Sequence, residues 1–401
     1  MKSTLAAAVG ALVILLTGPT PARAFGPGTV VNANDAGPGS LRAAMASGAS
    51  LIDFDPGFFG VPRSIKLNSP LPYINADLSI IGPGATLLTV DGQFKSNPTA
   101  LVNILNTSTV VRLEGFTLTG GYDPLSTGDV GGIFSRGRLT LDGLRLSNNR
   151  GTALFNQGGV VLIEETAVAS NSGQGMVNQG GTLGLRQSFV GSNGAEGIFN
   201  QGGRVTIANS TFAQNNGGIF NQVGDLSIYN STISANRDYG VISVVGGAPV
   251  QRLFTAHSTI FANHSSFDLA LDGNASVNYS LLEFIGTTVN GVGNIIGVDP
   301  QLGPLAYQGG LTPGFLPQAG SPAIDFGSNP LNLAIDQRGV ARVINGRADI
   351  GAVETIPEPA SSLLLAIASG GFAGRRRLRN SRILSPVGIL SRIALLATKR
   401  R

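Results

Sequence analysis

A four-residue motif, Asn-Gln-Gly-Gly, recurs through the middle of the sequence at a nearly constant interval. It begins at Asn156, Asn178 and Asn200, and a degenerate copy begins at Asn221, so the spacings are 22, 22 and 21 residues. A second asparagine series keeps the same period, and lies seven residues earlier in most copies. Its members are Asn149, Asn171, Asn193, Asn215 and Asn236. A period this regular indicates a solenoid made of one stacked structural unit.

Within each period, apolar positions alternate with polar ones in two short stretches that are separated by a corner. In the copy that precedes Asn149, these positions are Leu139 and Leu141, then Leu144 and Leu146. The inward positions recur from Val111, Leu113, Phe116 and Leu118 at one end to Leu253, Thr255, Ser258 and Ile260 at the other. Alternation with period two predicts a short strand in each stretch. A third strand, such as 198–200, is expected before the Gly-Gly pair turns the chain again.

Three short strands in a turn of about 22 residues predict an all-β fold, a right-handed parallel β-helix whose rungs stack about 4.8 Å apart. An α-solenoid would need apolar spacings of three and four residues, and propeller blades need about 40 residues. Stacked asparagines can form amide ladders along such a stack. We therefore interpret both asparagine series, and Asn209 and Asn230 on a repeated corner, as structural and not as ligand-binding residues.

The sequence on either side of the repeats predicts an end closure at each end. We expect an N-terminal cap and first rungs over residues 25–100, with a short helix that has Ser40 as its N-cap and extends to Ser50. The repeats themselves cover residues 101–285. Residues 286–355 lack the period and are richer in Pro, which predicts an irregular C-terminal closure. Its charged residues Asp336, Arg338, Asp349 and Glu354 are expected to tie loops together.

Residues 1–24 have the form of a secretory signal peptide. Lys2 precedes a short apolar run, and Ala22 and Ala24 give the small-x-small pattern at which signal peptidase cuts. The run is too short to span a bilayer comfortably. We therefore expect the protein to be exported.

Residues 356–379 have the form of a sorting signal at the other end. Pro357-Glu358-Pro359 precedes an apolar stretch, and Arg375, Arg376 and Arg377 follow it. Such a stretch sits transiently in lipid while its arginines stay on the cytoplasmic side. The arrangement resembles the PEP-CTERM signal of bacterial proteins processed by exosortase. The resemblance implies that Pro357, Glu358 and Pro359 are the recognition motif and that an exosortase-type machinery is a partner.

The tail at 380–401 departs from that resemblance, because the arginine cluster normally ends the chain. The tail combines apolar runs with basic residues. It is either a basic amphipathic helix on the inner membrane face or, as we favour, an addition of no selected role. If the tail blocks processing, the protein stays anchored in the membrane by its C-terminus.

Several blocks in the exported body resemble secreted bacterial β-helix proteins with a choice-of-anchor Q domain. The N-terminal blocks are Gly39-Ser40-Leu41-Arg42 and the stretch 80–92. The C-terminal blocks are Asp299-Pro300-Gln301-Leu302, Gly320 to Asp325, Asp336-Gln337-Arg338-Gly339 and Asp349 to Glu354. The resemblance implies that 286–355 is the choice-of-anchor Q-like region and that the β-helix lies on the cell surface or in the extracellular matrix. It implies no known reaction.

The composition excludes several chemistries. The chain has no Cys, so it has no disulfides, thiol chemistry or Cys-ligated metal. Its two His, His257 and His264, are expected on the surface. The net charge of +4 comes from the two ends, since residues 25–374 carry 16 basic against 23 acidic residues. An acidic body does not indicate a nucleic-acid partner. We expect no metal and no cofactor.

One charged cluster is the best catalytic candidate. Asp142, Glu164 and Arg186 follow one another at 22-residue intervals, and Glu165 is next to Glu164. Residues one period apart lie on adjacent rungs, so the four should gather on one side. The acids could bind Ca²⁺ through hard oxygens or act as an acid/base pair. The alternative, which we favour, is a stack of surface ion pairs that contributes little energy.

Two functions follow from these observations. The first is a structural or adhesive component of the extracellular matrix that makes weak polysaccharide contacts and catalyses nothing. The second is a Ca²⁺-dependent polysaccharide lyase or a glycoside hydrolase that uses the acids of one β-helix face. The acidic body argues mildly against an anionic substrate, because like charges repel.

Overall fold

The computed structural model describes residues 26–95, 100–122, 130–244, 253–272, 274–284 and 288–356. The chain divides into two units, Met1–Thr355 and Ile356–Arg401. Only Ile356 of the second unit is described, so the fold below is that of the first. The predicted signal peptide with Ala22 and Ala24, the sorting motif, the arginine cluster and the basic tail lie outside the described residues.

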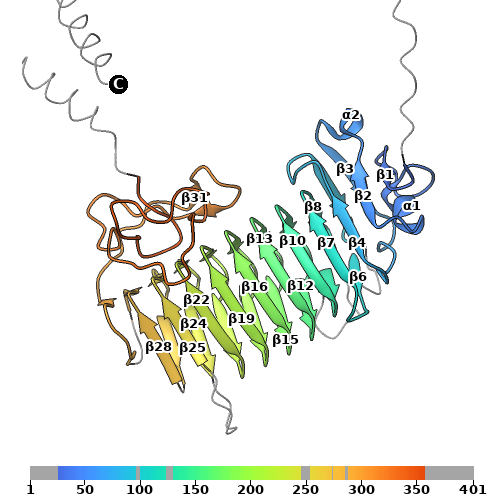
Figure 1. The fold of residues 1–401 in the computed structure, drawn as a ribbon. Helices are drawn as coiled ribbons and strands as arrows, with labels where there is room; N and C mark the ends of the chain where they lie inside the picture. Colours follow the sequence, from blue (N-terminus) through green and yellow to red (C-terminus); the bar gives the residue numbers. More distant parts are fainter. Residues whose placement is uncertain are drawn as a thin grey trace, which may run out of the picture. The chain divides into compact units, whose positions relative to one another are not determined.

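Three parallel sheets build the solenoid, and each complete rung takes one strand from each sheet (Figure 1). The first sheet contains β1 (Thr29–Val30), β2 (Leu51–Phe54), β4 (Leu78–Ile81), β7 (Val110–Glu114), β10 (Arg138–Asp142), β13 (Val160–Glu164), β16 (Thr182–Arg186), β19 (Arg204–Ala208), β22 (Asp225–Tyr229), β25 (Leu253–His257) and β28 (Asn274–Asn278).

The second sheet contains β3 (Arg63–Lys66), β5 (Leu88–Asp91), β8 (Thr117–Thr119), β11 (Arg145–Ser147), β14 (Ala167–Ala169), β17 (Phe189–Gly191), β20 (Thr211–Ala213), β23 (Thr232–Ser234), β26 (Ile260–Ala262), β29 (Leu281–Leu282) and β30 (Ile295–Ile296). The third contains β6 (Val102–Ile104), β9 (Val130–Ser135), β12 (Thr152–Gln157), β15 (Met176–Gln179), β18 (Ile198–Gln201), β21 (Ile219–Gln222), β24 (Tyr239–Val244) and β27 (Phe267–Leu271).

The predicted inward positions form the core of the central rungs. Leu139 pairs with Val111 on one side and Val161 on the other, and all three are buried. Because every rung leaves its apolar face to its neighbours, stacking buries one continuous column.

The prediction for the rung at 253–262 is wrong by one residue. Leu253 is 50% exposed, whereas Phe254 is 3% exposed and pairs with Leu226. The inward residues of this rung are therefore Phe254, Ala256, Thr259 and Phe261, in place of Leu253, Thr255, Ser258 and Ile260. Phe254 follows its partner Leu226 by 28 residues, which is more than one period, so the alternation alone could not show which residues of this rung point inward. Ile260 is buried too, but it packs with Ala323 and Ile350.

The N-terminal end is closed by α1 (Leu41–Ala46), and α2 (Pro56–Phe59) follows β2. Ser40 is the N-cap of α1, as predicted, and its Oγ accepts the N–H of Ala43 at 3.2 Å. The helix ends at Ala46, four residues before the predicted end at 50, since Ser47 is its C-cap.

The first asparagine series lies inside the solenoid as a hydrogen-bonded ladder. Asn171 Oδ1 accepts both the backbone N–H and the Nδ2–H of Asn149 at 3.0 Å. The same two bonds join Asn171 to Asn193, Asn193 to Asn215 and Asn215 to Asn236. All five side chains are buried, so the ladder satisfies amide groups that would otherwise cost free energy.

The second series forms a parallel ladder beside the third sheet. Asn156 donates to Asn178 at 2.8 Å, Asn178 to Asn200 at 2.8 Å and Asn200 to Asn221 at 2.6 Å. Asn221 then donates to Ser243 Oγ at 2.9 Å. Each of these asparagines also donates to the carbonyl of the second Gly of its motif or of the equivalent residue.

The irregular C-terminal region does more than close the end. Ile295–Ile296 adds a final strand beside β29, and residues 298–355, called the C-terminal region below, then fold back beside the rungs, where Figure 1 shows them in orange and red. The region contains the hairpin β31 (Ala306–Tyr307) and β32 (Pro313–Gly314). Asn209 and Asn230 hold it by donating to the carbonyls of Ile335 and Ser328. In the described part of the chain, no helix has the length and apolarity to cross a membrane.

Candidate functional site

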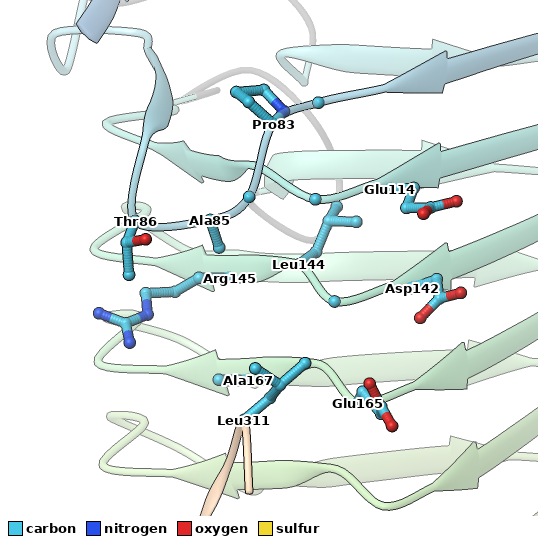
Figure 2. Close-up of a pocket in the computed structure, with 14 residues that line it drawn as sticks. Pro83, Ala85, Thr86, Glu114, Asp142, Leu144, Arg145, Glu165, Ala167 and Leu311 are labelled. Carbon is cyan, nitrogen blue, oxygen red and sulfur yellow. The ribbon is translucent and has the colours of Figure 1, made fainter. Parts of the chain in front are cut away.

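A groove lies at the corner between the first and second sheets (Figure 2). Its volume is about 390 Å³, and we call it the corner groove. Glu114 and Asp142 end β7 and β10, and Glu165 follows β13. The other residues that line the corner groove are Gly82, Pro83, Gly84, Ala85, Thr86, Gly115, Gly143, Leu144, Arg145, Ala167 and Leu311. It is therefore built from three rungs, an N-terminal loop and the C-terminal region.

The backbone of the corner explains why acids gather there. The last residue of each strand points outward, opposite to the buried residue before it. The next residue turns the chain with a positive φ, which is 67° at Gly115, 58° at Gly143 and 47° at Glu165. Glu165 thus occupies a left-handed corner that glycine fills on the two preceding rungs.

The carboxyl groups of the corner groove have different electrostatic environments. Arg112 contacts Glu114 Oε2 at 2.8 Å and Asp142 Oδ2 at 2.6 Å. These carboxylates raise the pKa of Arg112 above its ordinary value, the hydrogen bond to Glu114 most of all. Burial raises the pKa of Glu165, and the charges of Asp142 and Glu164 raise it further. Glu165 therefore takes up a proton at higher pH than an ordinary glutamate.

The structure divides the predicted cluster between two places. Asp142 and Glu165 line the corner groove. Glu164 and Arg186 lie on the outer face of the first sheet, where Arg186 Nη1 is 3.8 Å from Glu164 Oε1. Asp142 and Glu164 are in register at the ends of β10 and β13, so this column of charge is shared between the two places. Glu165 lies one residue further on, at the corner. Within the described ranges, no three His, Asp or Glu side chains are grouped as a metal site.

The outer face of the third sheet carries a row of glutamines that was not predicted from the sequence. Gln157 Nε2 donates to Gln179 Oε1 at 3.0 Å, and Gln179 donates to Gln201 at 3.1 Å. Gln222 continues the row in register with Gln201. Arg136 donates to Gln157 at 2.8 Å at the other end. The row could have been predicted from the residue that follows each repeated Asn. This residue must point outward because the Asn points inward.

An apolar column runs beside this glutamine row. Phe134 stacks on Phe155 with centroids 5.8 Å apart, and Phe199 stacks on Phe220 at 5.4 Å. Val177 joins the two pairs, because it is in register with Phe155 and Phe199. We call the glutamine row and the apolar column together the amide–aromatic face.

His264 is not the surface residue that the sequence analysis expected. Its Nδ1 accepts the backbone N–H of Asn236 at 3.2 Å, and its Nε2 lies 3.1 Å from the carbonyl of Ile233. Burial lowers the pKa of His264 to about 4. His257 is half-buried against Tyr279 and Ser328, and burial lowers its pKa as well.

The charged residues of the C-terminal region form a buried cluster. Arg342 Nη2 contacts Glu354 Oε1 at 3.0 Å and donates to the carbonyls of Asp349 and Gly351. Arg338 pairs with Asp336 at 2.8 Å. Burial raises the pKa of Glu354 to about 8, although Arg342 opposes the shift. Two arginines thus face three carboxyl groups, so one carboxyl can keep a proton without leaving an unpaired cation.

Comparison with known proteins supports the fold and leaves the activity open. A family model described as the right handed beta helix region matches residues 132–282. The crystal structure of pectate lyase Pel9A is similar with a TM-score of 0.51 and 15% identity, over 79% of this chain and 91% of that one. No curated protein sequence matches significantly.

The A-module of the mannuronan C-5 epimerase AlgE4 from Azotobacter vinelandii gives a TM-score of 0.43 and 13% identity, over 67% of this chain and 74% of the module. At these identities the likenesses concern the fold alone. The predicted fold class is confirmed: the described chain is an all-β parallel β-helix, and its residues 132–282 match the right handed beta helix region.

Proposed function

We propose that the protein is an exported, surface-sorted β-helix that binds polysaccharide along the amide–aromatic face and does not need to catalyse a reaction to function. The observation that carries the proposal is the pairing of an outward amide row with an apolar column on one sheet. Sugar rings have apolar faces and hydroxyl edges. A glycan lying along the solenoid axis would meet the amide row on rungs about 4.8 Å apart. Beside that row it would meet the half-buried rings of Phe134, Phe199 and Phe220, whereas Phe155 and Val177 between them are buried.

The chemistry of the glutamine row suits repeated weak contacts. A glutamine inside the row uses one N–H and one oxygen lone pair in hydrogen bonds to its neighbours. Its second N–H and second lone pair are available to a ligand. Arg136 adds a guanidinium that also lies over Phe134, 5.5 Å from the ring centroid. Many such contacts on one polymer give avidity that no single rung supplies.

The test is affinity electrophoresis in gels that contain defined neutral and acidic polysaccharides. The double variant Gln179→Ala/Gln201→Ala should lose retardation at least several-fold, because it interrupts the row. Gln318→Ala, an exposed glutamine of the C-terminal region, is the matched control and should migrate like the parent. Equal retardation of all three proteins would refute binding at this face.

The address signals are a separate part of the proposal. We infer processing by signal peptidase after Ala24 and by an exosortase-type enzyme near Pro357-Glu358-Pro359, with the choice-of-anchor Q-like region at 286–355 retained. Intact mass and cell fractionation test this. A surface-bound species from Phe25 to about Pro359 is expected, and a membrane species that retains residues 360–401 would contradict it.

Glycoside hydrolysis at the corner groove is the second candidate function. Its supporting observation is that Glu165 has a raised pKa while Asp142 is paired with Arg112. Such a difference fits a protonated general acid beside an ionised carboxylate. A reducing-end assay on oligosaccharides should then show turnover that Glu165→Gln abolishes and that Glu283→Gln, outside both grooves, leaves intact. Absence of turnover in the parent would leave the binding function alone.

A further inference from the structure

A second hollow lies on the outer face of the first sheet, away from the amide–aromatic face. Its volume is about 780 Å³, which is within the range of small-molecule sites. Its floor is made by β10, β13, β16 and β19, and its wall by residues 331–334 of the C-terminal region. We call it the sheet groove.

The depth of the sheet groove comes from one glycine. Leu162, Gly184 and Thr206 are successive members of one outward column, in register on β13, β16 and β19. Leu162 is 52% exposed, and the missing side chain at Gly184 opens the floor between it and Thr206. An exposed leucine at the bottom of a hollow is favourable only when something apolar covers it.

The wall of the sheet groove is held in place before any ligand arrives. Asn209 on the corner donates to the carbonyl of Ile335, directly after the wall. Asn329 donates to the carbonyl of Leu333 and accepts its N–H, each at 2.8 Å. The wall therefore presents Leu331, 44% exposed, at a fixed place opposite the sheet.

The polar groups of the groove are of both signs and are incompletely used. Glu164 and Arg186 line it, and their 3.8 Å separation is longer than a hydrogen bond. Both side chains are about half exposed, so each keeps free hydrogen-bonding capacity. Thr140, Thr182 and Thr206 add hydroxyl groups, and Asn332 adds an amide. A ligand here meets one carboxylate, one guanidinium, three hydroxyls, one amide and an apolar floor.

We propose that the sheet groove binds an N-acetylated amino sugar of the polysaccharide, and the proposal rests on the proposed binding function. An acetamido group is neutral and has an N–H donor, a carbonyl acceptor and a methyl group. The N–H fits Glu164, the carbonyl fits Arg186, and the methyl covers Leu162 above Gly184. An anionic sugar would face Glu164, a cationic amine would face Arg186, and a plain hydroxyl would leave the apolar floor uncovered.

The experiment is calorimetric titration of the full chain with three tetrasaccharides that have the same linkage. They are the fully N-acetylated glucosamine tetramer, the same tetramer without acetyl groups, and the glucose tetramer. The acetylated probe should bind at least about tenfold more tightly than either of the others, the order of discrimination that one buried apolar group gives.

Two kinds of variant locate the site. Gly184→Val should fill the hollow and abolish binding. Its backbone conformation does not need glycine, and its Cβ would meet only the flexible end of Leu162 at 3.1 Å. Arg186→Gln should weaken binding about tenfold, whereas Arg204→Gln, an exposed arginine on the next strand and outside the groove, should not. Thermal unfolding verifies that each variant is folded.

The outcomes separate this inference from the proposed function. Equal affinity for acetylated and plain tetramers, or tight binding that survives both Gly184→Val and Arg186→Gln, would overturn the assignment while polysaccharide binding stands. Loss of retardation in Gln179→Ala/Gln201→Ala with intact tetramer binding would support two separate sites. If no polysaccharide and no tetramer binds the parent, the proposed function fails together with this site.

Discussion

His264 replaces an asparagine at the end of the first ladder. Its Nδ1 accepts the N–H of Asn236 at 3.2 Å, the bond that Asn236 Oδ1 makes with Asn215. Its Nε2 pairs with the carbonyl of Ile233, as Asn215 Nδ2 pairs with that of Val190. Since Nδ1 must accept and Nε2 must donate, the ladder fixes the neutral tautomer of this histidine.

A loss of stability in mild acid follows from that tautomer. The folded pKa of about 4 lies below the unfolded value of 6.5. The contribution of His264 is therefore present above pH 6.5 and is lost as the pH falls towards 4. The full loss is about 3 kcal/mol.

His264→Asn restores the amide partner and should flatten this acid dependence while it keeps stability near pH 7. Urea unfolding of parent and variant at pH 7, 5.5 and 4.5 measures the difference. The difference between the free energies of unfolding of parent and variant at each pH cancels the contributions of the other titrating groups. Parallel curves for the two proteins would contradict the assigned role of His264.

Asn193→Ala should remove one complete step of the ladder. The side chain accepts two N–H groups from Asn171 and donates to Asn215 and to the carbonyl of Val168. Each donor left unsatisfied in the buried ladder costs about 1–3 kcal/mol, so we expect a loss of about 3–5 kcal/mol. Ser192→Ala on the same rung is the control, with an expected change of about 0.5 kcal/mol. A similar midpoint for both variants in urea would contradict the ladder's role.

The repeats show what the sequence could and could not predict. Period-two alternation predicted strands and the inward side chains of the central rungs, because a rung buries one face only against its neighbours. The inward residues were predicted wrongly in the rung that begins at Leu253. Both Leu253/Thr255 and Phe254/Ala256 fit the period-two pattern there, so the pattern could not choose between them. The stacking of charged residues one period apart was also predicted. It was not predicted that Glu164 and Glu165, which are adjacent in the sequence, line different grooves.

The folding-back of the C-terminal region had no signal of its own. Thr211 and Gln337 are hydrogen-bonded although they lie far apart in the chain. No local periodicity links residues in different kinds of structure, so the wall of the sheet groove could not be predicted. The glutamine row was predictable in principle, because an inward Asn156 forces Phe155 and Gln157 outward.

Arg342→Met should destabilise the C-terminal region from within. Arg342 is fully buried and joins Glu354 to the carbonyls of Asp349 and Gly351. Removing the guanidinium leaves the carboxyl of Glu354 and the carbonyls of Asp349 and Gly351 without this buried donor, and each unsatisfied buried group costs about 1–3 kcal/mol. Hydrogen exchange should speed up over 298–355 and leave the central strands protected. Arg347→Met, an exposed arginine that lies over Phe326, should leave the exchange pattern unchanged, and equal patterns for both variants would contradict the prediction.

Glu354→Gln tests whether the buried cluster holds a proton at neutral pH. The folded pKa of Glu354 is about 8 and the unfolded value is 4.5. Because the folded value is the higher one, the stabilisation is fully present below pH 4.5 and is lost as the pH rises to 8. A glutamine resembles the protonated acid in shape and charge, so the variant should lose this alkaline dependence and keep the contact with Arg342. We expect its urea midpoint to exceed that of the parent increasingly between pH 6 and 9. A midpoint that is lower than the parent's at every pH would mean that Glu354 is ionised in the folded protein.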